Sequence, residues 1–375
     1  MKIGAGMIFF CRNLRGNGIR MIRIDRFLYR REKSLPLKVL LSPLYPFSLL
    51  YGCAVRLRTV GYATRLFQAS RLPCPVVSVG NITVGGTGKT PLVIALASRL
   101  KGRGITVAVL SRGYKGSGTS GPVVSDGETI HLSPEEAGDE AYLMAERLRG
   151  LPVLVGKDRF TNGRIALQRY GIRGILLDDG FQHLPLHRDL NIVLVDSTIG
   201  FGDRHLLPRE ILRQPLTHLR RAGLFLLTKV EDPGACRPLE DLLRKVHPEA
   251  PVFHSSYEAS GLVGPRGEWE EIPSSQGRRV IALSGIANPS PFLSLLKKCG
   301  MRVINEVIFP DHHRYTQQDL ASIEKKGNGA DWIVTTEKDL VRLARLQTGK
   351  LPIRALRIDM KFWEEAFFQE VVKVF

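Results

Sequence analysis

The segment from Pro75 to Leu100, PVVSVGNITVGGTGKTPLVIALASRL, restricts the fold of this 375-residue chain more than any other feature. Its apolar start, residues 75–79, has the length of a buried strand. A glycine-rich turn ending in Gly-Lys-Thr follows, and apolar residues then recur at helical spacing, with Pro91 in the first turn. A strand, a glycine-rich loop, a Lys-Thr pair and a helix together wrap a polyphosphate, so we expect an α/β fold built around such a site.

The glycine-rich loop supplies several kinds of phosphate ligand. Loop N–H groups and the helix N-terminus face the anion, Lys89 reaches the terminal phosphates, and the Thr90 hydroxyl can bind Mg²⁺. The usual pattern, G-x-x-x-x-G-K-[ST], would have glycine at position 83, where this chain has threonine. We assign nucleotide binding to the whole turn: Thr83, Val84, Gly85, Gly86, Thr87, Gly88, Lys89 and Thr90.

Charge and cysteine content narrow the class of protein. The five cysteines are scattered and form no C-x-x-C, which argues for a reducing compartment and against a disulfide scaffold or a zinc site. The net charge is +18, and residues 1–72 contribute +12, from 14 Lys and Arg against 2 Asp and Glu. Such a segment suits nucleic acid, an anionic membrane surface or an anionic substrate. Because no aromatic-plus-basic RNA-binding motif occurs, we expect no nucleic acid partner.

Residues 36–55, PLKVLLSPLYPFSLLYGCAV, are the most apolar stretch of the chain. Their length approaches that of a membrane span, but Pro43 and Pro46 lie inside, and Arg56 and Arg58 follow. This pattern favours an interfacial helix whose apolar face enters the membrane surface while the cations meet anionic head groups. The alternative is a helix packed on the protein's own core.

A second strong signal is the sequence GILLDDGFQH at residues 174–183, which predicts a buried strand ending in Asp178 and Asp179. Phosphate-loop proteins place a Mg²⁺-side carboxylate on such a strand end. Adjacent residues of a strand point to opposite faces, so only one carboxylate should lie nearest the metal, and the sequence leaves open which. The alternative is an ordinary strand end that happens to carry two acids.

Other polar segments could bind phosphate or move a proton. Arg112 and Lys115, after a predicted strand at residues 105–110, could contact phosphates or simply be solvated. The segments FPDHHRY at residues 309–315 and TTEKD at residues 335–339 also have the character of a chemical site. Transfer of a phosphoryl group to an acceptor needs a base, and the candidate bases are Asp139, Asp178, Asp179, His183 and His312.

The chain divides into four parts on sequence pattern alone. We expect a basic extension at residues 1–35 without an assigned function, a membrane-surface segment at 36–72, a nucleotide-binding domain at 73–223 and a smaller α/β domain at 224–375 that closes the active-site cleft. In the last part, strands are predicted at 251–254, 279–283, 302–308, 332–335 and 353–358, and helices near 237–246, 289–299, 316–326, 338–346 and 362–372. No second glycine-rich loop occurs there.

Taken in order, these segments resemble the tetraacyldisaccharide 4'-kinases, the lipid A disaccharide kinases of Gram-negative bacteria. The shared segments are LLSPLYPFSLLYG, VGNITVGGTGKTP, LSRGYKG, GDEAYLMA, DDGFQH, GFGDRHLLP, FPDHHRY and VTTEKD. The resemblance implies a P-loop NTPase-type, mostly parallel sheet flanked by helices, a second smaller α/β domain and an N-terminal membrane-associating helix. It also implies transfer of the γ-phosphoryl group of Mg·ATP to the 4'-hydroxyl of a tetraacylated glucosamine disaccharide 1-phosphate, giving lipid IVA at the cytoplasmic face of the inner membrane.

The resemblance also implies roles for individual residues. Lys89 and Thr90 match the phosphate and Mg²⁺ residues, and Asp178 and Asp179 match the acidic pair near the metal. Asp139 matches the catalytic base and His312 its partner. The cleft residues are Arg112, Glu140, Arg159 and His183. The sequence departs from the family at Glu210 and Gln214, where glycine and glutamate are common. We further expect a monomer that is peripheral or monotopic at the membrane.

A rival hypothesis is a membrane-associated GTPase or ATPase switch that binds a partner and transfers nothing. The segment Thr228–Glu231, TKVE, partly matches the base-reading N/T-K-x-D of GTPases, although glutamate replaces aspartate. Nucleotide preference and dependence on an acceptor distinguish the two hypotheses: a kinase should prefer ATP and yield a phosphorylated lipid, whereas a switch should release phosphate without an acceptor.

Overall fold

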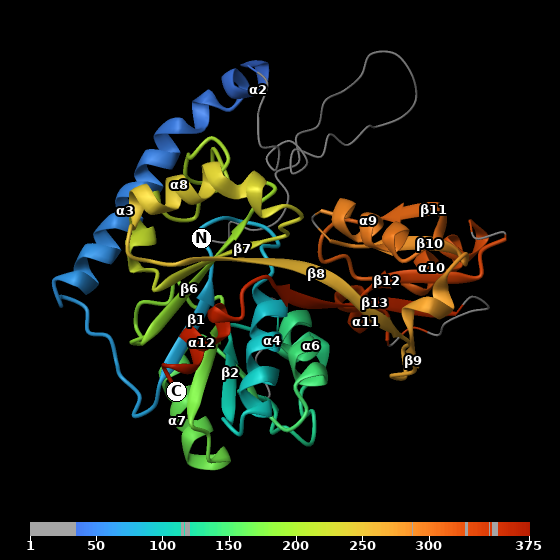
Figure 1. Ribbon diagram of the computed structural model, residues 1–375, viewed down its shortest axis with the longest axis horizontal. Coiled ribbons are helices and arrows are strands. Elements are labelled where there is room, and N and C mark those ends of the chain that lie inside the picture. The colour runs from blue at the N-terminus through green and yellow to red at the C-terminus, as the bar shows by residue number, and fades with distance from the viewer. Residues whose placement is uncertain are drawn as a thin grey trace.

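The computed structural model describes residues 35–113, 116, 121–286, 288–326, 329–344, 346 and 352–375. The basic extension up to residue 34 and Lys115 lie outside the described residues. Figure 1 shows a larger and a smaller unit, joined by the long strands β8 (Val252–Val263) and β13 (Ile353–Phe362). Both units are layers of helix and mostly parallel sheet, as the sequence predicts.

The sheet of the larger unit is organised around β1 (Val76–Gly80), the strand before the phosphate loop. The strand order is β7-β6-β1-β5-β2-β4-β3, and β3 alone pairs antiparallel within this stretch. The other strands are β2 (Val107–Ser111), β3 (Val123–Ser125), β4 (Val153–Val155), β5 (Gly174–Asp178), β6 (Leu190–Asp196) and β7 (Leu224–Thr228). Because β1, β2 and β5 are parallel neighbours, their carboxyl ends meet at one edge, where α/β proteins bind ligands.

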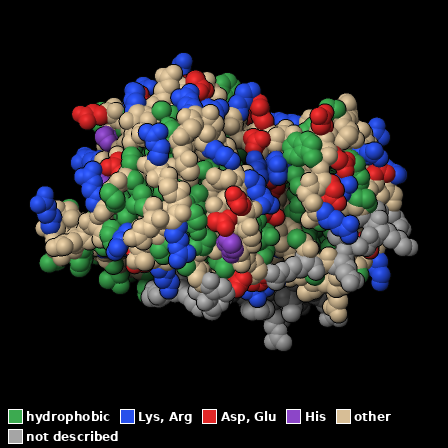
Figure 2. Space-filling model, turned by 90° about the horizontal axis from the view of Figure 1, so that it is seen from below, with side chains coloured by type: hydrophobic (Ala, Val, Ile, Leu, Met, Phe, Trp, Pro, Cys, Tyr) green, Lys and Arg blue, Asp and Glu red, His purple; other side chains and the backbone are tan. Residues whose placement is uncertain are grey.

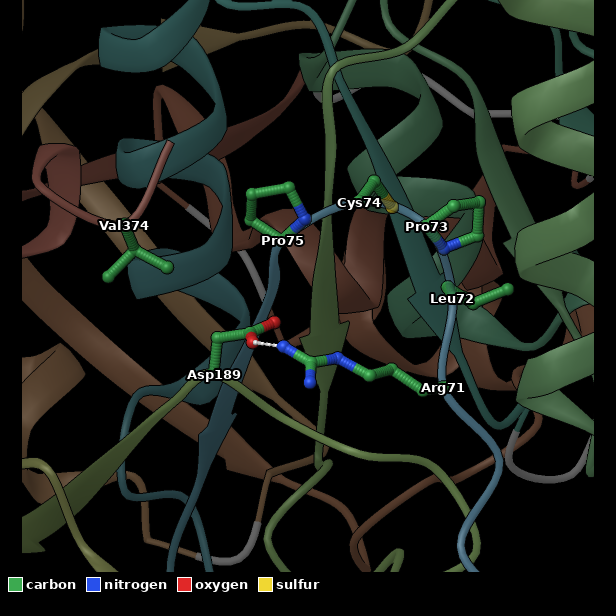
Figure 3. A pocket seen from close by; sticks show the side chains of 7 residues that line it. All are labelled: Arg71, Leu72, Pro73, Cys74, Pro75, Asp189 and Val374. Carbon is green, nitrogen blue, oxygen red and sulfur yellow. Dashed lines mark hydrogen bonds and ion pairs between the residues drawn. The ribbon is translucent and has the colours of Figure 1, made fainter.

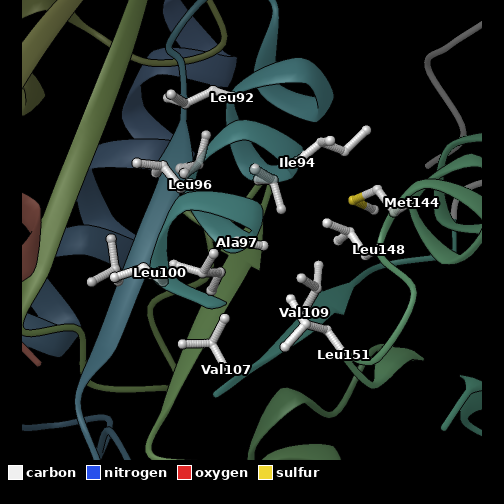
Figure 4. Close-up of a cluster of buried hydrophobic side chains, with 14 of the residues drawn as sticks. Leu92, Ile94, Leu96, Ala97, Leu100, Val107, Val109, Met144, Leu148 and Leu151 are labelled. Carbon is white, nitrogen blue, oxygen red and sulfur yellow. The ribbon is translucent and has the colours of Figure 1, made fainter. Parts of the chain in front are cut away.

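Helices cover both faces of this sheet and bury its apolar residues. They are α4 (Lys89–Gly102), α5 (Pro134–Ala137), α6 (Asp139–Arg147), α7 (Arg159–Tyr170) and α8 (Arg237–Val246). Figure 4 shows the cluster in which Leu96 and Leu100 of α4 and Met144 of α6 gather beside Val107 and Val109 of β2. All five side chains are fully buried. Each large apolar side chain contributes about 1.5–3 kcal/mol when buried, so this packing fixes α4 behind the phosphate loop.

The smaller unit continues the sheet in the order β11-β10-β12-β13-β8, with β9 paired to β8. Its remaining elements are β9 (Trp269–Glu270), β10 (Arg279–Ser284), β11 (Arg302–Ile308), β12 (Trp332–Thr336), α9 (Ser290–Lys298), α10 (Gln317–Lys325) and α11 (Glu337–Leu343). Short 3₁₀ turns are η1 (Ser42–Leu44), η2 (Leu216–Arg221), η3 (Pro233–Cys236) and η4 (Ile272–Ser275). Each strand and helix predicted after residue 224 has a counterpart in the structure, and those predicted near 237–246 and 362–372 belong to the larger unit.

The division expected after residue 223 cuts through the sheet of the larger unit. Strand β7 pairs with β6, and Leu243 of α8 packs in the same cluster as Phe225 of β7. The last helix, α12 (Ala366–Val372), also returns to the larger unit, where Phe367 is fully buried. Since β8 pairs with β7 at its start and with β13 along the rest, we propose that the boundary lies within β8. The hydrophobic pattern of a strand does not reveal its neighbours.

The apolar N-terminal segment forms α2 (Leu35–Leu40) and α3 (Tyr45–Ala63), joined by η1. Pro43 lies in that joint, and Pro46 lies in the first turn of α3, where a missing N–H is harmless. By length and composition the segment Lys38–Ala63 could cross a membrane, yet only 17% of its most apolar 18-residue stretch is buried in the protein. Most of this segment therefore does not serve the protein's own core.

Helix α3 buries small residues and exposes large apolar ones, the reverse of a helix in the core of a soluble protein. Its buried residues are small: Ser48, Gly52 and Gly61. Leu50 and Leu57, by contrast, are 68% and 72% exposed. An exposed face of this kind is typical of a surface that meets a membrane or another apolar partner.

Positive charge is not confined to this N-terminal segment. On the face presented in Figure 2, Lys and Arg side chains are distributed over the larger and the smaller unit, interspersed with hydrophobic side chains. Acidic side chains lie among them in the same view, so this face carries charges of both signs.

Candidate active site

The phosphate loop has the backbone that its glycines predict. Gly85 and Gly88 have φ of 108° and 91°, values that side-chain-bearing residues rarely adopt. A Cβ atom on Gly88 would also collide with the buried hydroxyl group of Tyr257. Gly88 directly precedes α4, which places Lys89 and Thr90 in the first turn of that helix.

The threonine at position 83 has a structural explanation. The Val84 N–H donates to the Ile211 carbonyl at 2.8 Å, and the Arg213 N–H donates to the Ile82 carbonyl at 2.7 Å. Thr83 therefore lies opposite Leu212 in a short antiparallel bridge. In such an extended conformation a β-branched residue is favourable, and the freedom of glycine is not required.

The Lys-Thr pair and the acidic strand end lie side by side, as the sequence predicts. Strands β1 and β5 are neighbours, with Val79 opposite Asp178. The Lys89 Nζ atom is 3.5 Å from Asp179 Oδ1 and 3.4 Å from the side-chain oxygen of Asn81. Thr90 is buried at the start of α4. The groups predicted to bind phosphate and metal thus lie together at one edge of the sheet.

Asp178 is buried and has one unsatisfied oxygen. Its Oδ2 atom accepts a hydrogen bond from the Ser111 hydroxyl at 3.1 Å, whereas no donor among the described residues reaches Oδ1. Burial, and then the negative charges of Glu140 and Asp179, raise the pKa of Asp178 to about 7. A divalent cation would satisfy the buried oxygen and offset this crowding of negative charge, so the residues present fit Mg²⁺.

Asp179 has the opposite environment. Arg213 donates to both of its oxygens, at 3.0 and 3.1 Å. Although burial opposes ionisation, Lys89 and Arg213 hold the pKa of Asp179 well below its usual range. Since the oxygens of Asp179 are occupied by cationic partners, the geometry favours Asp178 as the carboxylate nearest the metal. Among the described residues, no group of three or more His, Cys, Asp or Glu side chains is arranged so that it could hold a metal ion.

Asp139 and His312 approach each other across the two units. Asp139 is the first residue of α6, and His312 lies in the loop after β11. His312 Nδ1 is 3.2 Å from Asp139 Oδ2, and Arg342 Nε is 2.8 Å from the same oxygen. Burial raises the pKa of Asp139, but the neighbouring His312 and Arg342 outweigh it and leave that pKa below its usual value. Asp139 is therefore an ionised carboxylate, as a proton acceptor must be.

Helix α6 is attached to the smaller unit by further ion pairs. Lys338 of α11 donates to Glu140, and this lysine is the main reason that the pKa of Glu140 is lowered. About two turns further, at the last residue of α6, Arg147 donates to both oxygens of Glu337, at 2.9 and 3.0 Å. The charges of Lys89 and Asp179 also act on Glu140, so the start of α6 lies within electrostatic reach of the phosphate loop.

Arg159 and His183 form a buried polar pair behind the acidic strand end. Arg159 donates to the Asp178 carbonyl at 3.2 Å and lies 3.3 Å from His183 Nδ1. Burial, followed by the charges of Arg159 and Arg188, lowers the pKa of His183 to about 4. His183 is therefore neutral near pH 7. Arg112, at the end of β2, is exposed, and its charge acts on Arg159.

Several residues of the site were not singled out from the sequence. They are Asn81, Ser111, Arg213, Lys338 and Arg342, each of which contacts a predicted site residue. Lys338 lies in the TTEKD segment that had chemical character, and Arg213 lies in a polar loop without a regular period. Arg342 follows on the same helix as Lys338, but nothing in its local sequence distinguishes it from a solvated arginine.

Two cavities differ in their relation to this site. The larger, about 460 Å³, is at the start of β1 and is lined by Arg71, Cys74, Asp189 and Val374 (Figure 3). The carboxyl ends of the strands lie at the opposite edge of the sheet, so this cavity is remote from the phosphate loop. Its Arg71–Asp189 ion pair, at 3.3 Å, is on the surface.

The smaller cavity, about 190 Å³, lies between α3 and the active-site loops. Tyr51 and Arg58 of α3 line one side, and Gln182, Arg213 and Gln214 line the other. Since Arg213 binds Asp179, this cavity connects the inner face of the apolar helix with the acidic pair.

With this geometry established, we compared the chain with known proteins. The family model described as LpxK, tetraacyldisaccharide-1-P 4'-kinase, matches residues 40–375. The chain belongs to this family. A tetraacyldisaccharide 4'-kinase of Syntrophus aciditrophicus (strain SB) is 42% identical over 356 residues, covering 92% of this chain and 94% of the relative. Another, of Pelobacter propionicus, is 44% identical over 323 residues and covers 84% of this chain and 87% of the relative.

A solved structure extends the comparison to the fold. The crystal structure of an "apo" form of LpxK from Aquifex aeolicus in complex with ATP is 34% identical, with a TM-score of 0.72. The similarity covers 90% of this chain and 99% of that one. The predicted 4'-kinase family and the predicted fold class are therefore confirmed, and the activity expected of the chain is that of a kinase acting on a hydroxyl group.

Proposed function

We propose that this 4'-kinase family member transfers the γ-phosphoryl group of ATP to the 4'-hydroxyl of tetraacyldisaccharide 1-phosphate, giving lipid IVA. The observation that carries the proposal is the Asp139–His312 pair at the start of α6, within reach of the phosphate loop. A hydrolase or switch needs only a positioned water, whereas a kinase needs a base for the acceptor hydroxyl. The relative solved with ATP supports ATP as the donor.

The nucleotide would be bound by the residues around Gly88. Loop N–H groups and Lys89 would bind the phosphates, and the Thr90 hydroxyl with Asp178 Oδ1 would hold Mg²⁺. When bound, the ion neutralises phosphate charge and orients the terminal phosphate. Arg213 and Lys89 would keep Asp179 ionised beside it, and Glu140 would stay ionised through Lys338.

Asp139 would act as the general base. As the 4'-oxygen attacks the γ-phosphorus, its O–H bond breaks, the proton moves to the Asp139 carboxylate, and the bond from phosphorus to the ADP oxygen breaks. His312 touches the same carboxylate and would orient it. Arg159, His183 and Arg112 would line the cleft on the side of the acidic strand end.

The lipid acceptor would reach this site along α3. The exposed apolar face of α3 would enter the membrane surface, and the cations Arg56 and Arg58 would meet anionic head groups. The cavity between α3 and Arg213 would then receive the sugar end of the substrate. We propose a monomer that is peripheral or monotopic at the cytoplasmic face of the inner membrane.

The decisive experiment uses ATP labelled on its γ-phosphate, the full-length protein and a lipid A disaccharide extract in mixed micelles. Transfer of the label to lipid, seen on thin-layer separation, supports the kinase. Release of labelled phosphate without any lipid product would contradict it and favour the nucleotide switch. GTP in place of ATP is the matched control, since the kinase should use GTP poorly.

A further inference from the structure

We propose that Arg342 is a positioning residue for the phosphoryl transfer: it holds Asp139 Oδ2 and His312 Nδ1 together and leaves Asp139 Oδ1 for the acceptor hydroxyl. The inference rests on the proposed function, because it assigns Arg342 to the base of that reaction. Arg342 lies on α11 of the smaller unit, whereas the proposed base, Asp139, lies on α6 of the larger unit.

Every nitrogen of the Arg342 guanidinium group has a partner. Nε is 2.8 Å from Asp139 Oδ2, and Nη2 is 3.1 Å from His312 Nδ1. Nη1 donates to Asp339 Oδ1 at 2.8 Å and to the Gly285 carbonyl at 3.1 Å. The side chain is only 7% exposed. The planar fork of an arginine can make these contacts at once, which a single ammonium group cannot do.

The anchor of Arg342 is itself fixed. Asp339 is fully buried, and its Oδ1 also accepts a hydrogen bond from the Tyr315 hydroxyl at 3.1 Å. Its Oδ2 accepts from the Gly285 N–H at 3.0 Å and from the Thr336 hydroxyl at 2.8 Å. A buried carboxylate with this many donors has little freedom to move. Asp339 therefore holds Arg342 in a fixed position against Asp139.

The backbone of His312 is fixed by the same group of residues. Its φ is +58°, a region that non-glycine residues adopt only where the surroundings impose it. Its N–H donates to the Gly285 carbonyl at 3.2 Å, the oxygen that also accepts from Arg342. His312 and Arg342 are thus held in one arrangement by Gly285.

The His312 ring is placed by the same guanidinium group. Arg342 Nη2 is 3.1 Å from His312 Nδ1, and Asp139 Oδ2 is 3.2 Å from the same nitrogen. The other ring nitrogen, Nε2, is 3.9 Å from Asp311 Oδ2. Asp139, Asp311 and Arg342 are therefore the charged groups that face the ring.

The two carboxylate oxygens of Asp139 therefore have different surroundings. Both Arg342 Nε and His312 Nδ1 face Oδ2, and no described residue donates a hydrogen bond to Oδ1. The guanidinium group therefore fixes the rotation of the carboxylate and leaves Oδ1 to take the proton. Misplacement of a reacting group by about 1 Å can cost about 10²-fold in rate, so losing this contact should matter.

The first test replaces Arg342 in the full-length protein. Arg342→Lys keeps the charge but not the fork, and we expect kcat for lipid phosphorylation to fall about 10²-fold with little change in the KM for ATP. Arg342→Met removes the charge as well, and the acidic limb of the kcat profile should then move to higher pH, because Asp139 loses a cation that lowers its pKa. A purely structural role would move neither the limb nor the ratio of kcat to KM.

The matched control is Arg354→Lys. Arg354 is paired with Glu270 on the sheet of the same unit and touches none of the residues above. It reports what the loss of an arginine fork does to the stability of that unit alone. A kcat loss in Arg354→Lys equal to that in Arg342→Lys would overturn the inference.

A second measurement does not depend on turnover. The ¹³C shift of the Asp139 carboxyl group, assigned with an Asp139→Asn spectrum, should titrate at higher pH in Arg342→Met than in the wild-type protein, because Asp139 loses a cation that lowers its pKa. In Arg354→Lys the titration should match that of the wild-type protein. An Asp139 titration that is the same in Arg342→Met and in the wild-type protein would overturn the inference.

The proposed function and the positioning role of Arg342 can be refuted separately. If the wild-type protein transferred no phosphate to lipid, the proposed function would fail, and the titration of the Asp139 carboxyl group would still decide whether Arg342 acts on Asp139. If the wild-type protein were active and Arg342→Lys matched it in kcat, only the role of Arg342 would be refuted.

Discussion

Arg213 binds both carboxylate oxygens of Asp179, at 3.0 and 3.1 Å. The backbone of the same residue accepts a hydrogen bond from the Tyr51 hydroxyl of α3 at 3.0 Å, and its N–H donates to Ile82 at the phosphate loop. One residue thus touches the apolar helix, the acidic pair and the loop. The apolar helix and the candidate active site are therefore parts of one connected structure.

The first prediction concerns this pair. In Arg213→Gln, Asp179 loses two donors while it remains partly buried, and we expect a destabilisation of about 1–3 kcal/mol. The measurement is denaturant unfolding of the full chain. Arg204→Gln, at an exposed arginine of the same loop, is the control and should be nearly neutral. Equal midpoints for wild type and Arg213→Gln would mean that the ion pair does not stabilise the fold.

Asp139 carries the second prediction. Asp139→Asn removes the base but keeps the size of the side chain, so kcat should fall about 10²–10⁴-fold while the KM for ATP stays close to that of the wild type. Steady-state kinetics with the lipid acceptor provide the measurement. If kcat and ATP affinity fell together by the same factor, Asp139 would be a residue of the nucleotide site rather than the base.

The third prediction tests the outer face of α3. Leu50→Gln with Leu57→Gln places amides where apolar side chains are exposed. Each leucine buried in an apolar phase is worth about 1.5–3 kcal/mol, so binding to anionic vesicles should weaken about tenfold or more. Turnover of a water-soluble acceptor analogue should not change. Trp363→Gln, at an exposed apolar residue of β13's C-terminal end, is the control, and equal vesicle binding by all three proteins would refute membrane docking by α3.

The parts of the fold that the sequence predicts are those set by local pattern. The β1–loop–α4 unit, the acidic end of β5 and the strands of the smaller unit all follow from short apolar runs and turn residues. The pairing of β7 and the double role of β8 do not, because strand pairing depends on residues far apart in the chain. The boundary predicted after residue 223 therefore differs from the one that we propose within β8.

The residues of the candidate site likewise divide into those expected before the structure and those that were not. Asp139 and His312 are 173 positions apart, and their pairing was expected from the family resemblance and not from spacing. Arg213 and Arg342 were not expected, because each becomes part of the site only through tertiary contacts with Asp179 and Asp139. An arginine in a loop or on a short helix has no local feature that separates a buried ligand from a solvated charge.

The fourth prediction is a pH dependence of metal binding. The pKa of Asp178 is raised to about 7, above the usual value near 4, so the folded protein binds a proton here that the unfolded chain has lost. Its contribution to stability is therefore present at low pH and is lost as the pH rises to about 7. Mg²⁺ needs the ionised form, so Mg·ATP binding should tighten over the same range and then level off.

This dependence is measured by titrating Mg·ATP between about pH 5.5 and about pH 8, on either side of the raised pKa. Asp178→Asn keeps the shape of the side chain but cannot ionise, and its residual pH dependence belongs to the nucleotide itself. The difference between the two slopes is the predicted effect. Parallel slopes for wild type and Asp178→Asn would show that Asp178 does not hold the ion.

The last prediction returns to position 83 of the phosphate loop. Since residues 82–84 pair with 211–213 in an extended bridge, Thr83→Gly should not improve ATP binding, although it restores the usual glycine pattern. It should instead destabilise the protein by about 0.5–1 kcal/mol, because glycine loses more backbone freedom on folding. Gly88→Ala should abolish nucleotide binding, since φ is 91° there and a Cβ would collide with Tyr257. Gly102→Ala, at the end of α4 and outside the loop, is the steric control, since a Cβ there has no atom within 4 Å. Tighter ATP binding by Thr83→Gly would mean that the bridge strains the loop instead of supporting it.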